Sequence, residues 1–166
     1  MKNIYEVFDE FEEAASKKDK MAVIEKNLSK TLVDVLQYTF HPDYQWTVED
    51  MPENYKIPNF PVGLSPCQLS TEIRKLYLFQ KGHPETVNIT ERKRNELLIQ
   101  LLESIEPREA EVVIGIFKKD QGVKGLTYKF VKEAFPQLLQ ICRLNLRSEE
   151  HTSELQSRQY LVCRLL

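Results

Sequence analysis

The sequence of 166 residues has only three cysteines, three histidines and no long run of apolar residues. Cys67 and Cys142 lie far apart without Cys-x-x-Cys spacing, so neither a zinc site nor a disulfide framework is expected. A bilayer span needs roughly 20 consecutive apolar residues, and no stretch approaches that length. The acidic, amphipathic start is unlike a signal peptide. We therefore expect a cytoplasmic protein without membrane contact.

The motifs of several enzyme classes are also missing. The sequence has no Gly-x-x-x-x-Gly-Lys-Ser/Thr loop for a triphosphate and no His-Glu-x-x-His pair for zinc. Nucleotidyl transfer by ligases needs Lys-x-Asp-Gly, but here Gln121 separates Asp120 from Gly122. His41 and His83 stand beside prolines at predicted helix ends. We therefore predict no catalytic residue, no metal site and no cofactor, and we expect that the protein is not an enzyme.

The last part of the chain does not have the pattern of a folded segment. Residues 147–157 read RSEEHTSELQS, which matches the translation of a common sequencing adapter, and residues 159–166 continue without caps or turn signals. We therefore expect a non-native tail over residues 147–166. The remaining residues, 1–146, have the length and apolar content of one ordinary domain with a packed core.

Apolar residues recur at helical spacing along most of residues 1–146. This periodicity predicts helices over 3–15, around 21–24, and over 28–40, 65–82, 90–105, 107–119 and 127–135. Ser29, Ser65, Thr90 and Thr127 are the expected N-terminal caps or start residues. His41 precedes a proline and should end the third helix. The sequence thus predicts an all-α, single-domain helical bundle with short connections.

A long proline-rich section at about 42–65 interrupts the helices. It contains four aromatic residues, Tyr44, Trp46, Tyr55 and Phe60. A loop of this length in a compact domain needs a structural reason. We expect the aromatic side chains to attach it to the helical core as an ordered loop, with a short extended piece at 45–48.

Charge is small in total but uneven along the chain. The formal net charge is −2. Residues 1–60 hold seven Lys or Arg against twelve Asp or Glu, whereas residues 115–132 hold five lysines against Asp120 alone. Nucleic-acid binding requires a local basic patch rather than a basic whole.

The basic segment lies at a predicted turn between two helices. Lysines at the end of the first helix complement its dipole, and glycines permit positive φ or close backbone approach. The second helix starts at Thr127 with amides that lack internal partners, and such helix starts bind phosphate. An αα-hairpin with ordinary caps would give the same pattern. The predicted phosphate-binding residues are Lys118, Lys119, Gly122, Lys124, Gly125, Thr127, Lys129 and Lys132.

Residues 108–136, REAEVVIGIFKKDQGVKGLTYKFVKEAFP, resemble the end of the all-helical N-terminal DNA-binding domain of ATP-dependent DNA ligases. The shared parts are an acidic-apolar helix, a basic turn with glycine, a helix started by Ser or Thr, and Ala-Phe-Pro. Glu25-Lys26-Asn27, before a helix that ends in aromatic residues, is similar to the opening of phage-type ligases. The layout also resembles a small family of tailed-phage proteins. This turn lacks the arginine and the Ile-Gly step that ligases usually have.

The resemblance implies the ligase-domain fold and contact with the DNA backbone on both sides of a nick. We expect a phage-encoded, stand-alone, non-catalytic module that contacts the phosphates of double-stranded or nicked DNA. It would act in replication, repair or host takeover in the host cytoplasm, with phage or host replication proteins as further partners. Two alternatives are a protein-interaction module that uses the acidic helix 3–15, and the N-terminal fragment of a full ligase.

Overall fold

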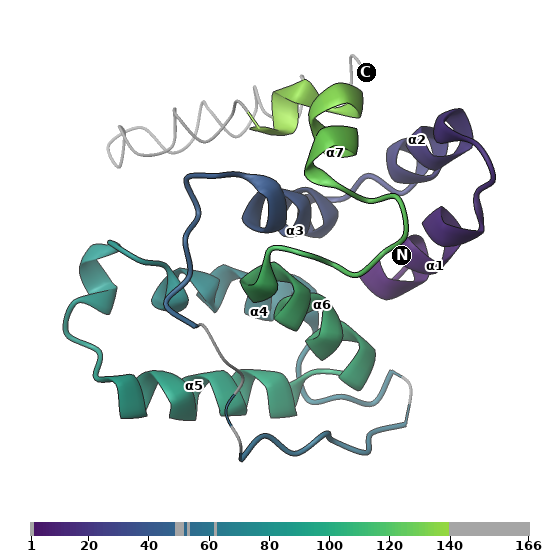
Figure 1. Cartoon of the computed structure of the whole chain (residues 1–166). Helices are drawn as coiled ribbons and strands as arrows, with labels where there is room; N and C mark the ends of the chain where they lie inside the picture. The colour runs from purple at the N-terminus through teal and green to yellow at the C-terminus, as the bar shows by residue number, and fades with distance from the viewer. Residues whose placement is uncertain (1, 49–51, 53, 62, 140–166) are drawn as a thin grey trace, which may run out of the picture.

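The computed structural model describes residues 2–48, 52, 54–61 and 63–139. The expected tail over residues 147–166 lies outside these residues. The described part of the chain contains helices and no β-strand, which confirms the predicted all-α class (Figure 1). Its elements are α1 (Ile4–Glu13), α2 (Lys17–Lys26), α3 (Lys30–Phe40), α4 (Leu69–Glu72), α5 (Glu91–Ser104), α6 (Pro107–Lys118) and α7 (Tyr128–Ala134), with 3-10 helices η1 (Ile73–Phe79), η2 (Pro84–Thr86) and η3 (Pro136–Leu139).

Helices α3 and α6 pack against each other at the centre of the fold (Figure 1). α1 and α5 contact α6, α2 contacts α1, and α7 with η3 covers α3. The apolar faces of these helices meet in one core, in which Leu36, Leu102 and Ile116 are completely buried. Each such side chain contributes about 1.5–3 kcal/mol through its removal from water. Packing of amphipathic faces therefore fixes the position of each helix.

Local capping signals set most of the helix boundaries. The hydroxyls of Ser29, Thr90 and Thr127 each accept a hydrogen bond from the backbone amide three residues later. These bonds satisfy amides that have no partner within the helix. α3 ends at Phe40, and its C-cap His41 is extended before Pro42, as predicted. The predicted caps at these three positions are confirmed.

The predicted helix start at Ser65 is wrong. α4 begins at Leu69, and the chain continues from Ile73 as a 3-10 helix. A tertiary contact sets this start, because the Leu69 amide donates to the buried Glu109 carboxylate of α6 at 2.9 Å. The Ser65 hydroxyl instead donates to the Cys67 carbonyl at 2.9 Å. A cap from a distant helix has thus replaced the local one.

The proline-rich loop is attached to the core by its aromatic residues. Trp46 is 6% exposed, and its ring packs edge-on against Tyr38 and Phe117. The Trp46 indole N–H donates to the Tyr38 carbonyl at 3.3 Å, and its backbone forms an isolated bridge with Gln80. Tyr55 also packs against the core. The predicted attachment of this loop is confirmed for these residues.

Candidate nucleic-acid interface

The turn between α6 and α7 begins with an unusual backbone conformation. Lys119 follows α6 in the left-handed region, with φ of 59°. Its backbone amide donates to the carbonyls of Gly115 and Ile116. Gly122 and Gly125 also have positive φ, of 67° and 92°. The expectation that these two glycines permit the turn is confirmed, since L-residues adopt such angles only at a cost.

The side chain of Lys119 points into the protein. Its ammonium donates to the carbonyls of Tyr38 and His41, at 2.9 and 3.2 Å, and lies 5.7 Å from the centroid of the Trp46 ring. Burial lowers the pKa of Lys119 from 10.5 to about 8. The prediction that Lys119 binds phosphate is therefore corrected: this ammonium satisfies carbonyls at the C-terminal end of α3.

Two amides of the turn are also occupied. The Gly122 amide donates to the Asp120 carboxylate at 2.9 Å, and the Lys124 amide donates to the Glu12 carboxylate of α1 at 2.7 Å. The Thr127 hydroxyl accepts from the Phe130 amide at 3.3 Å. Carboxylates at these positions repel an anion, and both amides already have acceptors within the protein. Thr127 acts as a helix cap.

Gly125 is approached by a lysine of the protein itself. The Lys20 ammonium of α2 donates to the Lys124 carbonyl at 2.8 Å and lies over the Phe11 ring. A Cβ at Gly125 would lie 2.6 Å from that ammonium. Gly125 therefore makes room for Lys20 rather than for a phosphate. We call the four side chains that hold the turn the turn junction: Glu12, Lys20, Lys119 and Gln121, whose amide donates to Thr39 at 2.8 Å.

The remaining lysines of the prediction extend into solvent. Lys118, Lys124, Lys129 and Lys132 are all exposed. Lys129 and Lys132 lie on α7, where the Lys132 ammonium is 5.8 Å from the Tyr128 ring centroid. Lysines of this kind can neutralise phosphates without fixed geometry, because the ammonium is a point charge on a flexible stem.

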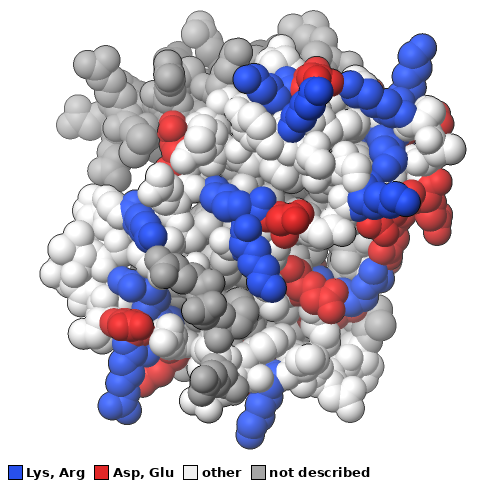
Figure 2. Space-filling view, in the orientation of Figure 1, with Lys and Arg blue, Asp and Glu red and all other residues white. Residues whose placement is uncertain are grey.

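Helix α2 adds lysines that the sequence prediction missed. The Lys17 ammonium pairs with Glu133 of α7 at 2.5 Å, so the start of α2 lies beside α7. Figure 2 shows blue side chains gathered over α7 and α2, with red groups among and below them. The run Lys17-Lys18-Asp19-Lys20 could have indicated these lysines from the sequence. It was missed because residues 1–60 as a whole are acidic. We use the name basic surface for the exposed lysines of α2, α7 and the turn before α7: Lys17, Lys18, Lys124, Lys129 and Lys132.

The Glu133 carboxylate is in close contact with a lysine of the basic surface. Lys17 lowers the pKa of the Glu133 carboxyl through their ion pair. Both side chains are about half exposed, so the pair is screened by solvent and contributes little to stability. The surface therefore keeps a positive balance, with Lys17 partly neutralised.

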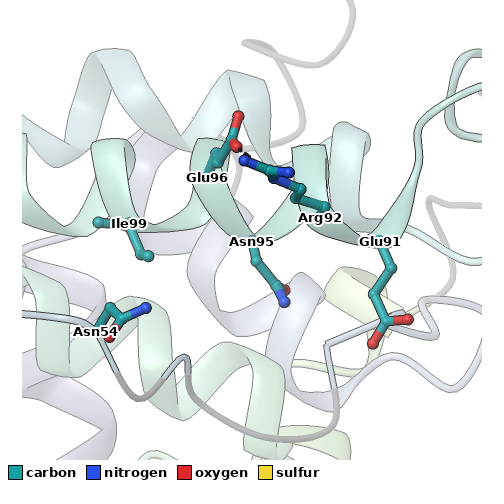
Figure 3. Close-up of a pocket in the computed structure, with 6 residues that line it drawn as sticks. All are labelled: Asn54, Glu91, Arg92, Asn95, Glu96 and Ile99. Carbon is teal, nitrogen blue, oxygen red and sulfur yellow. Dashed lines mark hydrogen bonds and ion pairs between the residues drawn. The ribbon is translucent and has the colours of Figure 1, made fainter.

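Other hollows of the described residues have different chemistry. A shallow depression of about 530 Å³ lies between the loop and α5, where Arg92 points toward Glu96 and forms an ion pair at 3.3 Å (Figure 3). A second hollow of about 250 Å³ is lined by Cys67, Glu72 and apolar residues of η1 and α5. Within the described ranges, no group of three His, Cys, Asp or Glu side chains is arranged to hold a metal ion. No helix there is long and apolar enough to span a membrane.

The fold and this surface define a small helical protein with a lysine-rich face. Residues 7–124 match the model of a family described as a family of unknown function, DUF6433. Since the match covers most of the chain, the protein belongs to that family. The matched range includes the turn junction and Lys124 but ends before α7. A comparison with curated proteins gives no match.

Proposed function

We propose that this chain is a non-catalytic module that binds the phosphate backbone of DNA through its basic surface. The observation that carries the proposal is the meeting of α2 and α7. Two segments more than a hundred residues apart in sequence contribute exposed ammonium groups to one face, joined by the Lys17–Glu133 contact. Counterion release on phosphate neutralisation would supply the free energy of binding.

The mode of contact follows from the residue types. Lysine side chains on the outer face of α7 and on the turn can each reach a backbone phosphate, and such contacts position a protein without reading sequence. The turn junction supports them by holding the backbone beneath Lys124. We therefore propose sequence-independent binding of double-stranded or nicked DNA, and a role for the module in phage replication, repair or host takeover.

The alternative role of the acidic helix in protein interaction receives less support. The carboxylates of Asp9, Glu10 and Glu12 on α1 bond to Arg108, to Lys2 and Asn27, and to the Lys124 amide. The apolar face of α1 is buried in the core. Most charged and apolar groups of α1 thus make contacts within the protein.

Salt-dependent binding tests the proposal. We expect the full chain to bind labelled duplex and nicked duplex DNA, with affinity that falls steeply as salt rises. The double variant Lys124→Ala/Lys129→Ala should weaken all duplex sequences alike and reduce the slope of log K against log salt by about two units, one for each phosphate that is no longer neutralised. Fluorescence anisotropy at several salt concentrations measures both quantities.

A matched control uses two exposed cations of a different helix. Arg92→Ala/Lys93→Ala removes the same charge from α5, where neither residue belongs to the basic surface. This variant should leave the salt slope unchanged. Absence of binding by the parent chain at low salt, or equal slopes for the two double variants, would contradict the proposal.

A further inference from the structure

Tyr128 is the one aromatic side chain that the described part of the chain presents beside the lysines of the basic surface. It is the first residue of α7 and is 44% exposed. It lies between Lys124 and Lys129 in sequence, and the Lys132 ammonium is 5.8 Å from its ring centroid. An exposed tyrosine among lysines has a ring for stacking and cations for phosphates within the same small area.

The position of Tyr128 contrasts with that of the other aromatic residue of α7. Phe130 is 8% exposed and packs edge-on against Phe11 of α1, with ring centroids 5.2 Å apart. The core contact of Phe130 and the Thr127 cap anchor the first turn of α7. The Tyr128 ring is therefore held on a fixed backbone while a large part of its surface faces solvent.

Such an arrangement suits a nucleotide whose base is not paired. Aromatic side chains stack on bases of any type, and neighbouring cations track the phosphates, which together give sequence-tolerant binding of single strands. In an intact duplex both faces of each base are covered by its neighbours, so a protein ring gains this contact only where a base is unpaired.

We infer that Tyr128 stacks on an unpaired base of the nucleic acid held by the basic surface, so that gapped or single-stranded DNA is the preferred ligand over intact duplex. This inference rests on the proposed function and adds the kind of DNA structure recognised. The lysines supply affinity for any DNA, and Tyr128 supplies the preference.

The test compares three labelled ligands of equal length: an intact duplex, a duplex with a short gap, and a single strand. We expect the full chain to bind the gapped duplex about fivefold or more tighter than the intact one, in line with stacking of one base on an aromatic ring. Tyr128→Ala should abolish that preference and leave intact-duplex affinity within about twofold, whereas Tyr128→Phe should retain the preference.

Two further measurements separate stacking from other causes. Tyr77→Ala is a matched control, because Tyr77 is 37% exposed but lies on η1 against His83. Tyr77→Ala should change the affinity for neither the gapped nor the intact duplex. A 2-aminopurine base in the gap should lose fluorescence when the parent chain or Tyr128→Phe binds, but keep it with Tyr128→Ala.

The outcomes distinguish this inference from the proposed function. Equal affinity of the parent chain for gapped and intact duplex, or an equal decrease in affinity for both ligands in Tyr128→Ala, would overturn the stacking role while leaving phosphate binding in place. Failure of the parent chain to bind any of the three ligands would overturn both.

Discussion

Lys118 and Lys119 are neighbours in sequence, yet the fold uses them in opposite ways. Lys118 is exposed, whereas Lys119 donates to two carbonyls at the end of α3. The same contrast separates the turn junction from the basic surface. In the turn junction, charged side chains bond to the protein's own backbone, and in the basic surface they remain in solvent. A lysine-rich turn is thus not in itself a binding site, because some of its ammonium groups donate hydrogen bonds to the protein's own backbone.

Removal of the Lys119 side chain should give the largest effect. Lys119→Ala leaves the Tyr38 and His41 carbonyls without this donor, and hydrogen bonds to a charged group are each worth about 1.5–3 kcal/mol. Relief of the burial cost of the ammonium offsets part of this effect. We expect the free energy of unfolding to fall by about 2–3 kcal/mol.

The adjacent lysine provides the control for that measurement. Lys118→Ala should change the free energy of unfolding by less than about 0.5 kcal/mol, as is usual for exposed positions. Urea denaturation followed by circular dichroism compares the two variants. Equal stability of the two variants would show that the fold does not depend on the inward position of Lys119.

Asp34 extends the comparison to a second enclosed charge. Burial raises the pKa of the Asp34 carboxyl from 3.8 to about 6, against the opposing effects of Lys30 and Arg74. Between these two values the folded state binds more protons than the unfolded state, so stability falls as pH rises from about 4 to about 6. Above this window the burial cost of the carboxylate is fully present.

Asp34→Asn removes that cost without changing the size of the side chain. We expect the variant to be more stable than the parent chain by about 1–2 kcal/mol at pH 7, a value reduced for partial solvent exposure. The difference should shrink toward zero near pH 4. Denaturation curves at several pH values measure it, and a difference independent of pH would show that the carboxyl titrates normally in the folded chain.

The smallest expected effect concerns the ion pair within the basic surface. Glu133→Gln should leave the free energy of unfolding nearly unchanged, since both partners are about half exposed and solvent screens their attraction. It should nevertheless increase DNA affinity by about twofold at low salt, because Lys17 is released and one negative charge is removed.

The matched control for this change is Glu96→Gln on α5. Glu96 has an exposure similar to that of Glu133 and also pairs with cations, Arg92 and Lys93. It should leave DNA affinity unaltered. If both variants raise affinity equally, the effect comes from net charge alone and the contrast between the basic surface and the rest of the molecule disappears.

Much of the fold could be predicted from local patterns in the sequence. Helical periodicity predicted α1, α3, α5 and α6. The capping residues Ser29, Thr90 and Thr127 predicted the starts of α3, α5 and α7. These signals act over three or four residues, so they are visible without a structure. The start of α4 was missed because its cap, Glu109, comes from another helix.

The candidate site was predictable only in part. Its exposed lysines on the turn and on α7 were identified from charge density, but Lys17 and Lys18 were hidden in an acidic segment. The Lys124 amide looked free in sequence because its acceptor, Glu12, lies on α1, more than a hundred residues away.

The sequence by itself determined the helical class, the position of the turn and the number of lysines near it, since propensity, capping and composition are local properties. Only the tertiary structure decided which of those lysines are available. Packing brought α1, α2 and α3 against the turn, where backbone carbonyls and carboxylates must find partners once water is excluded. That requirement drew Lys119 and Lys20 inward and left the basic surface in solvent.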